Sequence, residues 1–272
     1  MKAIFLSDVH LKRLTDPGSE RCMIFLDHLL GKGKETQEPF NDTMITTDLL
    51  VIAGDFFDFW FERNGIVYPE FRPVINKLIQ LKQSGVKISF CEGNHDFFLS
   101  DYFVKALDAE VIEEWASISL DGKRILISHG DTINRRDTKY LLLRRFLRSA
   151  FFYKLQLALP APFLWRVAQI ISGFGKTAKA QSAHNLLEKM RAFSSRKLRD
   201  GFDAVILGHC HKHLLEEIMI SGKVKTFAVL GDWVRQFSYL CYENGNFVAS
   251  TFQPSGGYIQ KNISRSYNLN KY

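Results

Sequence analysis

The chain has 272 residues, of which 46% are hydrophobic and 24% are charged. This composition is that of an ordinary globular protein, and it excludes a mainly disordered chain, a repeat array and a small disulfide-stabilised domain. The formal net charge of +7 is concentrated in residues 135–200, which hold 15 Lys and Arg against three acids, a local net charge of +12. A basic segment in an otherwise acidic chain predicts an anionic partner or surface nearby, with a solvated helical face as the alternative.

The sequence shows no pattern typical of export or of a membrane-spanning helix. The first apolar run, residues 3–6, is too short for a signal peptide. The longest apolar stretch, residues 155–171, is interrupted by Pro160, Pro162 and Arg166. The four cysteines are scattered and form no CxxC pair. We therefore expect a reduced, cytoplasmic protein.

Short apolar runs alternate with helical patterns along much of the chain. We predict buried strands over residues 3–6, 49–53, 86–91, 124–127 and 204–207. We predict helices over residues 22–30 and 70–84, with a loop containing Gly33 and Pro39 after the first and Gly85 ending the second.

Two regions depart from this alternation. Residues 139–199 are rich in Leu, Phe, Lys and Arg and predict a helical insertion. Residues 226–252 predict a β-rich segment with a hairpin turn at Asn244-Gly245, and the polar tail from Pro254 is expected to fray. Together these patterns predict an α/β fold of one domain, residues 1–272, that carries residues 139–199 as a lid.

Each predicted strand of the alternating part ends in Asp, Asn or His, and the carboxyl ends of such strands are where α/β sheets place ligands. The residues are Asp8, His10, Asp55, Asp58, Asn94, His95, His129, His209 and His211. A lone histidine is more often structural, but carboxylate, imidazole and amide oxygen together suit Mn²⁺, Fe²⁺ or Zn²⁺. The set predicts two divalent metal ions that clamp a phosphoryl group.

The motifs SDVH, GDFFD, GNHD, SHGD and GHCH, spread over residues 7–211, resemble the five blocks of the calcineurin-like metallophosphoesterase superfamily. The resemblance implies a four-layer α/β/β/α sandwich and a hydrolase. It also implies ligand sets, one of Asp8, His10, Asp55 and His211 and the other of Asp55, Asn94, His129 and His209, with Asp55 bridging. It further implies that Asn94 and His95 contact substrate and that His95 stabilises the transition state or acts as general acid.

A narrower resemblance rests on SDVHL, GDFFDFW, HGDTINRRDTKY, the ALP that precedes basic helices, and LGDW. These are similar to the family of bacterial UDP-2,3-diacylglucosamine pyrophosphatases of the lipid A pathway. That resemblance implies hydrolysis of an acylated UDP-sugar to UMP and lipid X, with Mn²⁺ as the metal. It also implies substrate contacts from Asp137 and from lid lysines such as Lys176 and Lys179. Asp137 has the alternative role of a helix N-cap, and His95 stands where many family members carry Arg.

Other functions remain open at this point. A general phosphodiesterase, a phosphatase or a nuclease would use the same metal site, and a non-enzymatic scaffold would use the fold for binding. A nucleic-acid partner is not favoured, because the basic segment interleaves long Leu and Phe runs rather than isolated stacking aromatics. A scaffold should have lost ligands, and none is missing.

The insertion also predicts contact with a membrane. Arg144, Arg145, Arg148, Lys154 and Arg166 interrupt its apolar runs, as in helices that lie on anionic lipid. We therefore expect a peripheral location on the inner membrane face, with part of the lid available for acyl chains. The sequence does not determine the oligomeric state.

Overall fold

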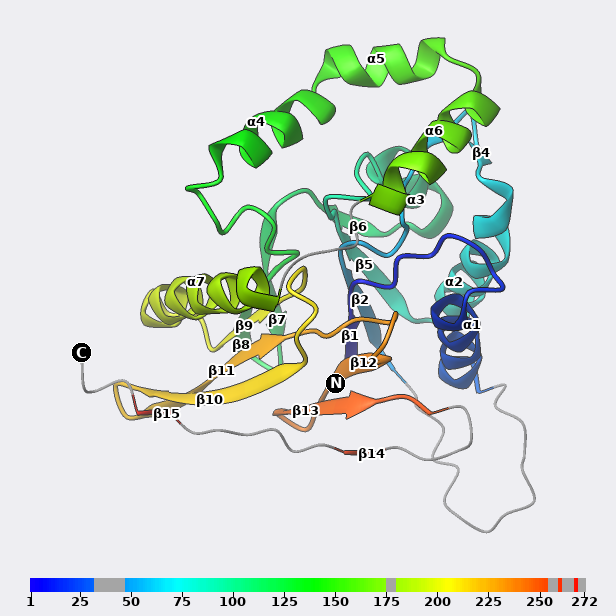
Figure 1. The fold of residues 1–272 in the computed structure, drawn as a ribbon. Coiled ribbons are helices and arrows are strands. Elements are labelled where there is room, and N and C mark those ends of the chain that lie inside the picture. Colours follow the sequence, from blue (N-terminus) through cyan, green and yellow to red (C-terminus); the bar gives the residue numbers. More distant parts are fainter. Residues whose placement is uncertain (32–46, 175–179, 254–258, 261–266, 269–272) are drawn as a thin grey trace.

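The computed structural model describes residues 1–31, 47–174, 180–253, 259–260 and 267–268, and within these ranges the side chains of residues 169–174, 180–183, 259–260 and 267–268 are not described. The expected loop around Gly33 and Pro39 lies outside the described residues. Two β-sheets form the centre of the molecule (Figure 1). The first sheet has the strand order β14-β13-β12-β1-β2-β5-β6, and the second has the order β15-β10-β11-β9-β8-β7.

The strands are β1 (Lys2–Leu6), β2 (Leu49–Ala53), β3 (Glu62–Arg63), β4 (Ile66–Val67), β5 (Lys87–Cys91), β6 (Glu110–Ile112), β7 (Trp115–Leu120), β8 (Lys123–Ser128), β9 (Ala204–Leu207), β10 (Leu214–Ile220), β11 (Lys223–Val229), β12 (Ser238–Glu243), β13 (Asn246–Thr251), β14 (Ile259–Gln260) and β15 (Tyr267–Asn268). The helices are α1 (Pro17–Leu29), α2 (Arg72–Gln83), α3 (Ser100–Leu107), α4 (Thr138–Leu147), α5 (Ala150–Ala158), α6 (Ala161–Phe174) and α7 (Ala180–Arg199), with a 3₁₀ turn over Pro69–Phe71.

Three apolar cores separate four layers. Successive residues of β1, such as Ile4 and Phe5, point to opposite faces of the first sheet. Ile4 lies in a core shared with α1, α2 and α3, and Phe5 lies in a core between the two sheets. The outer face of the second sheet packs Phe227 and its neighbours against Met190 and Leu198 of α7. The layers are therefore α/β/β/α, which confirms the predicted sandwich.

The predicted strands of the alternating part all form, because their runs are buried on both faces. Parallel pairing of β1, β2 and β5 in the first sheet, and of β8 and β9 in the second, brings their carboxyl ends together. The Asn244-Gly245 hairpin also forms, with φ of 51° and 81°, the left-handed conformation that a two-residue turn requires.

Most of the C-terminal tail, which the sequence predicts to fray, lies outside the described residues. Of its described residues, Ile259–Gln260 pair with β13 and Tyr267–Asn268 pair with β10. These two short segments bond to sheet edges despite the polar composition of the tail sequence.

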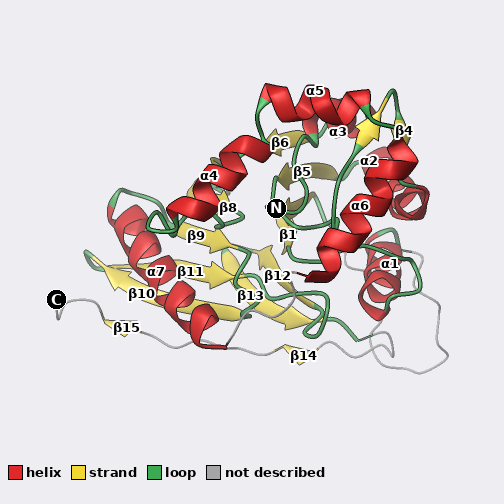
Figure 2. Ribbon diagram, turned by 45° about the horizontal axis from the view of Figure 1, so that its top comes forward, coloured by secondary structure: helices red, strands yellow, loops and turns green. Residues whose placement is uncertain are grey.

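The insertion at residues 139–199 divides into two structural parts. Helices α4, α5 and α6 leave the layered body and form an arch over one end of the sheets (Figure 2). Helix α7 returns to the body and is its fourth layer, with Met190, Ser194 and Leu198 fully buried. None of the helices in the described part of the chain is long and apolar enough to cross a membrane.

The packing of α7 makes a testable prediction about stability. Replacing the fully buried Leu198 by Ala should lower the free energy of unfolding by about 2–5 kcal/mol, through lost apolar contacts and a cavity. Leu142→Ala, on the arch where the side chain is 71% exposed, should change it by less than about 0.5 kcal/mol. Urea denaturation of both variants measures the difference, and equal losses would contradict this division of the insertion.

Candidate metal centre

The predicted ligand residues lie at one end of the two sheets. Asp8 and His10 follow β1, Asp55 follows β2, and Asn94 follows β5 in the first sheet. His129 follows β8, and His209 and His211 follow β9 in the second sheet. The structure thus brings together residues that are separated by up to 203 positions in the sequence.

Five of these seven residues have left-handed backbone conformations. Asp8, His10, Asp55, His209 and His211 have φ between 51° and 68°. Residues other than glycine adopt this region rarely, and it persists only where surrounding structure enforces it. Here the backbone N–H of Asp8 donates to the Gly54 carbonyl at 3.1 Å, and that of His10 donates to the Asp55 carbonyl at 3.0 Å. Strain of this kind is concentrated at functional sites.

The first cluster consists of Asp8, His10 and His211, which offer ligand atoms within 4.8 Å of one another. Asp8 Oδ1 lies 3.4 Å from His211 Nε2, and it accepts no hydrogen bond from the described residues although it is fully buried. Asp8 Oδ2 accepts from the Ser7 hydroxyl and from the His209 backbone N–H. One oxygen of this carboxylate is therefore positioned by the protein, and the other is directed into the cluster.

The second cluster consists of Asp55, His129 and His209. His129 Nε2 lies 3.4 Å from Asp55 Oδ2 and 3.2 Å from Asn94 Oδ1, so Asn94 joins this group. The other ring nitrogen of His129 donates to the Ala53 carbonyl at 3.0 Å, which fixes the ring orientation. Asp55 Oδ2 also lies 3.8 Å from His10 Nε2. Asp55 therefore lies between the two clusters, where a bridging ligand would be needed.

The ionisation of the site fits a pair of cations. Burial alone would lower the pKa of His10, but Asp58, Asp55 and Asp8 raise it to about 9. Burial has the same effect on His129, yet Asp55 and Asp8 raise its pKa to about 10. The facing histidines hold the pKa of Asp55 well below its usual range despite burial. Carboxylate, imidazole and amide ligands of this number can hold divalent cations in place of those protons.

A third group of three also offers ligand atoms within 4.8 Å of one another: His10, Asp58 and His95. His95 Nδ1 lies 3.1 Å from the Asp58 carbonyl oxygen, and its ring packs edge-on against His10 at 4.9 Å. The His95 backbone N–H donates to Asp55 Oδ1. His95 is therefore half-buried at the margin of the two clusters, a place from which it can reach a bound phosphoryl group.

Asp96 is a functional residue that the sequence interpretation missed. Its carboxylate is fully buried and accepts backbone N–H groups of Asp55, Phe56, Phe57 and Gly93 at 2.7–3.1 Å. Burial and the Asp55 charge raise its pKa to about 7. Asp96 thereby holds together the two loops that carry Asp55 and Asn94. The sequence signal for Asp96 was its place as the last residue of the GNHD motif, because a polar residue in a buried motif needs hydrogen-bond partners.

Asp131, Glu92 and Asp232 were also missed, and each partners a site or arch residue. Asp131 accepts from Arg144 Nε at 2.8 Å and from the Tyr140 hydroxyl. Glu92 pairs with Arg148, which also donates to the Gly93 carbonyl. Asp232 Oδ2 lies 3.7 Å from His211 Nδ1, and this contact and backbone N–H groups lower the Asp232 pKa to about 2 although burial opposes it. Two of these acids lie in motifs already noted in the sequence, Asp131 in SHGD and Asp232 in LGDW.

The glycines that precede the ligands leave no room for a side chain. A Cβ atom at Gly93 would overlap the Asp55 carboxylate, and one at Gly54 would overlap the His129 ring. The glycines of GNHD and GDFFD are therefore required by close packing around the ligands.

The predicted substrate contacts have different outcomes. The Asp137 side chain accepts the Tyr140 backbone N–H at 3.1 Å, so it is the N-cap of α4. It is exposed, and a substrate contact remains a prediction. Lys176 and Lys179 lie outside the described residues.

A sandwich of two mixed sheets with these ligands at one end defines a metallophosphoesterase. The family model of the calcineurin-like phosphoesterases matches residues 1–213, and the chain belongs to that family. This family uses divalent metal ions, and the chain is a phosphoesterase.

Among curated proteins the chain is similar to the UDP-2,3-diacylglucosamine hydrolase of Pseudomonas syringae pv. syringae, with 27% identity over 92% of this chain and 95% of the relative. It is similar to the protein of the same name from Haemophilus influenzae, with 27% identity over 89% and 96%. Among solved structures it is similar to an archaeal phosphodiesterase at 15% identity, with a TM-score of 0.42 over 92% and 98%; this distant likeness carries no further argument.

The raised pKa values of His10 and His129 predict a pH-dependent metal affinity. The pKa of His10 is raised from 6.5 to about 9 and that of His129 to about 10, so near pH 7.5 both are protonated in the metal-free protein. Coordination requires neutral imidazoles, so metal binding should release about two protons and tighten as pH rises. Calorimetry in two buffers of different ionisation enthalpy measures this release. Binding without proton release would contradict the charge state described here.

The same values set the stability of the metal-free protein. A histidine whose folded pKa is raised stabilises the fold fully below pH 6.5, and this contribution is lost as pH rises through 9 to 10. The melting temperature of chelator-treated protein should therefore fall between pH 7 and pH 10 more than that of metal-loaded protein. Equal falls would argue against protonated His10 and His129.

Substituting the central carboxylate tests the bridging position. Asp55→Asn keeps the shape of the side chain but removes the charge between the two clusters, so hydrolysis should fall more than about 10³-fold. The matched control is Asp27→Asn, the same change in a residue of α1 that pairs with Lys77 of α2. This variant should keep its activity. If Asp55→Asn turned over substrate nearly as fast as the unmodified protein, a bridging role for Asp55 would be contradicted.

Proposed function

We propose that this phosphoesterase hydrolyses the pyrophosphate of UDP-2,3-diacylglucosamine, giving UMP and 2,3-diacylglucosamine 1-phosphate, with Mn²⁺ as its metal and Fe²⁺ or Zn²⁺ as alternatives. The observation that carries this proposal is the apolar arch over the metal centre. Two proteins named for hydrolysis of this compound align over 89–92% of the chain. A substrate with two acyl chains and a pyrophosphate needs both an apolar surface and a cationic centre.

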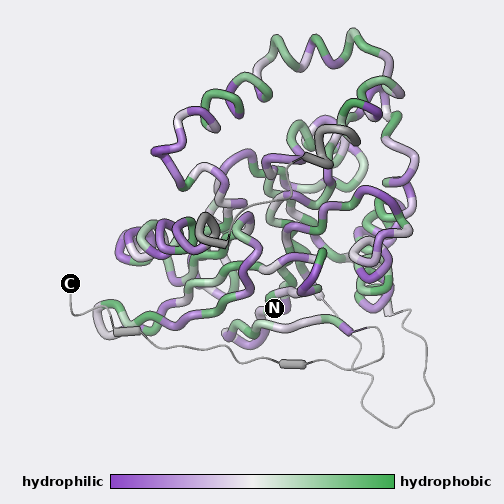
Figure 3. The backbone as a smooth tube through the Cα atoms, viewed as in Figure 1, coloured by the Kyte–Doolittle hydropathy of each residue, from purple (hydrophilic) through white to green (hydrophobic). Residues whose placement is uncertain are grey.

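The arch presents large apolar side chains outside the packed cores. Hydrophobic residues recur along α4, α5 and α6 away from the layered body (Figure 3). Leu142 is 71% exposed and Phe151 is 67% exposed. Among the arch side chains that the structure describes, Leu143, Phe146, Leu155 and Phe163 are also exposed. Apolar surface of this kind, next to polar groups, marks a site for an apolar partner or ligand.

Two ion pairs fix the arch to the metal centre. Arg148 at the end of α4 reaches buried Glu92 and the Gly93 carbonyl, beside Asn94. Arg144 reaches buried Asp131, two residues after His129. At the far end, Trp165 of α6 packs against Tyr68 at a ring distance of 5.5 Å. The arch is thus held where acyl chains bound on it would place a pyrophosphate near the clusters.

The residues of the site would act together on the phosphate. Two bound divalent cations would supply water activation and neutralise charge on the phosphoryl oxygens. His95 donates from Nδ1 to the Asp58 carbonyl, so as an imidazolium it could also donate a hydrogen bond or proton from Nε2 to the leaving oxygen. Asn94, positioned by its contact with His129, would orient the same group. Asp137, Lys176 and Lys179 belong to this proposal as contacts for the rest of the substrate.

Peripheral attachment to the inner membrane face from the cytoplasmic side is part of the same proposal. Arg145, Lys154 and Arg166 are exposed between the apolar side chains of the arch. Arg144 and Arg148, which the sequence analysis assigned to the membrane, instead pair with buried acids, so the attachment would rest on the other three.

A comparison of substrates tests the proposal. With Mn²⁺ present, UDP-2,3-diacylglucosamine should release UMP much faster than its deacylated form, bis-p-nitrophenyl phosphate or single-stranded DNA. Loss of the acyl preference, or faster cleavage of the diester or of DNA, would favour a general phosphodiesterase or a nuclease instead.

The role of His95 is tested by leaving-group dependence. If His95 protonates the leaving oxygen, His95→Ala should slow hydrolysis of the UDP-sugar by about 10²–10⁴-fold. The nitrophenyl ester has a leaving group that needs less protonation, so its hydrolysis should fall much less. Equal losses on both substrates would assign His95 to positioning or electrostatics alone.

A further inference from the structure

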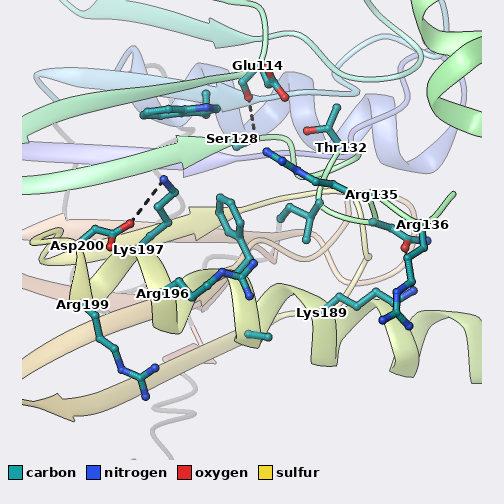
Figure 4. Close-up of a pocket in the computed structure, with 15 residues that line it drawn as sticks. Glu114, Ser128, Thr132, Arg135, Arg136, Lys189, Arg196, Lys197, Arg199 and Asp200 are labelled. Carbon is teal, nitrogen blue, oxygen red and sulfur yellow. Dashed lines mark hydrogen bonds and ion pairs between the residues drawn. The ribbon is translucent and has the colours of Figure 1, made fainter. Parts of the chain in front are cut away.

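A hollow of about 870 Å³ lies between α7, the strands β7 and β8, and the connection from His129 to α4. It is formed on the outer face of the second sheet, because Ser128 lines it whereas the next residue, His129, belongs to the metal centre. Figure 4 shows Arg135 entering from the connection and Arg196 and Lys197 rising from α7. The hollow is therefore separate from the two metal clusters.

The wall of the hollow carries a surplus of positive charge. Six basic residues line it against Glu114 and Asp200: Arg135, Arg136, Lys189, Arg196, Lys197 and Arg199. Lys197 lies 3.8 Å from Asp200, and Lys189 donates to Asn134. Within the described residues, Arg135, Arg136 and Arg196 have no ion pair. All six belong to the basic segment 135–200, and none of them pairs with the acids beside the metal centre that Arg144 and Arg148 bind.

Basic groups of this number suit a multiply charged phosphate, because Arg binds phosphate with two parallel hydrogen bonds and several cations can neutralise more than one negative charge. Mutual repulsion among unpaired cations also makes the empty hollow less stable than one that holds an anion.

Aromatic rings line the same hollow. Trp115 is 48% exposed, and Phe193 also lines the hollow. Lys197 Nζ lies 5.1 Å from the Trp115 ring and 5.9 Å from the Phe193 ring. Flat side chains next to cations are the arrangement that binds a planar base stacked beside its phosphates. The volume is that of a small-molecule site, and the charges surround one hollow rather than forming a long track for a polymer.

We propose that this hollow binds a nucleoside phosphate, with the base on Trp115 and Phe193 and the phosphates on Arg135 and Arg196. The proposal does not depend on which phosphoester the metal centre cleaves. Two sources share this chemistry: the nucleotide of a substrate or product, and free nucleotides of the cell.

Trp115 provides a local signal for the test. Trp60 and Trp233 are buried and Trp165 is half-buried, so a ligand in the hollow should quench Trp115 above all. Titration of the metal-loaded full chain with UDP should quench fluorescence with a Kd on the order of 0.1 mM. Trp115→Phe should remove most of this signal.

Charge reversal locates the site. Arg135→Glu combined with Arg196→Glu should weaken UDP binding about tenfold or more, through loss of phosphate contacts. Arg145→Glu combined with Lys154→Glu makes the same change in net charge on the exposed arch, outside the hollow, and should leave the quenching Kd within about twofold. Circular dichroism confirms that each variant is folded.

Competing ligands define the chemical class and its source. Tighter binding of UMP and UDP than of ATP would point to the substrate or product, and equal binding of ATP would point to the free nucleotide pool. Inorganic pyrophosphate binding as tightly as UDP, an equal loss in the control pair, or quenching by single-stranded DNA but not by mononucleotides would each overturn the proposal.

Discussion

Two carboxylates, Asp8 and Asp55, are buried at the end of two β-sheets, and a buried negative charge is stable only beside positive charge. The architecture of the site follows from this constraint. Imidazoles from both sheets approach the carboxylates, left-handed backbone turns direct them inward, and glycines leave the required space. In the metal-free protein, protons on His10 and His129 supply the positive charge. Divalent cations would supply it in the working enzyme.

Asp96 extends this arrangement to the second layer of contacts. A carboxylate that accepts four backbone N–H groups has one stable position, and it fixes the loops of Asp55 and Asn94 together. Beyond it, Arg148 and Arg144 connect the same loops to the arch through Glu92 and Asp131. The arch and the loop that carries Asn94 are thereby physically connected, since Arg148 donates to the Gly93 carbonyl and the Gly93 N–H donates to Asp96.

The sequence predicted the strands, and it predicted residues that the structure brings together at one end of the sheets, for a physical reason. Runs such as Leu49–Ala53 are buried on both faces, which makes them easy to recognise as strands. The residues that follow such runs, for example Asp55, are polar although they are buried, which is unusual outside a functional site. It did not predict that α7 belongs to the body, because its basic residues obscure the narrow buried stripe of Met190 and Leu198. The partners of Arg144 and Arg148 were also hidden, because Glu92 and Asp131 become neighbours only through the fold. The pairing of Tyr267–Asn268 depends on an exposed sheet edge, which is a tertiary feature.

We expect Asp55 to bridge two cations at the junction of the two sheets. Anomalous diffraction at the manganese edge from crystals grown with Mn²⁺ tests it most directly. The account predicts two peaks about 3.5–4 Å apart, one beside Asp8, His10 and His211, the other beside Asn94, His129 and His209, with Asp55 between them. A single peak, or two peaks that Asp55 does not contact, would contradict it.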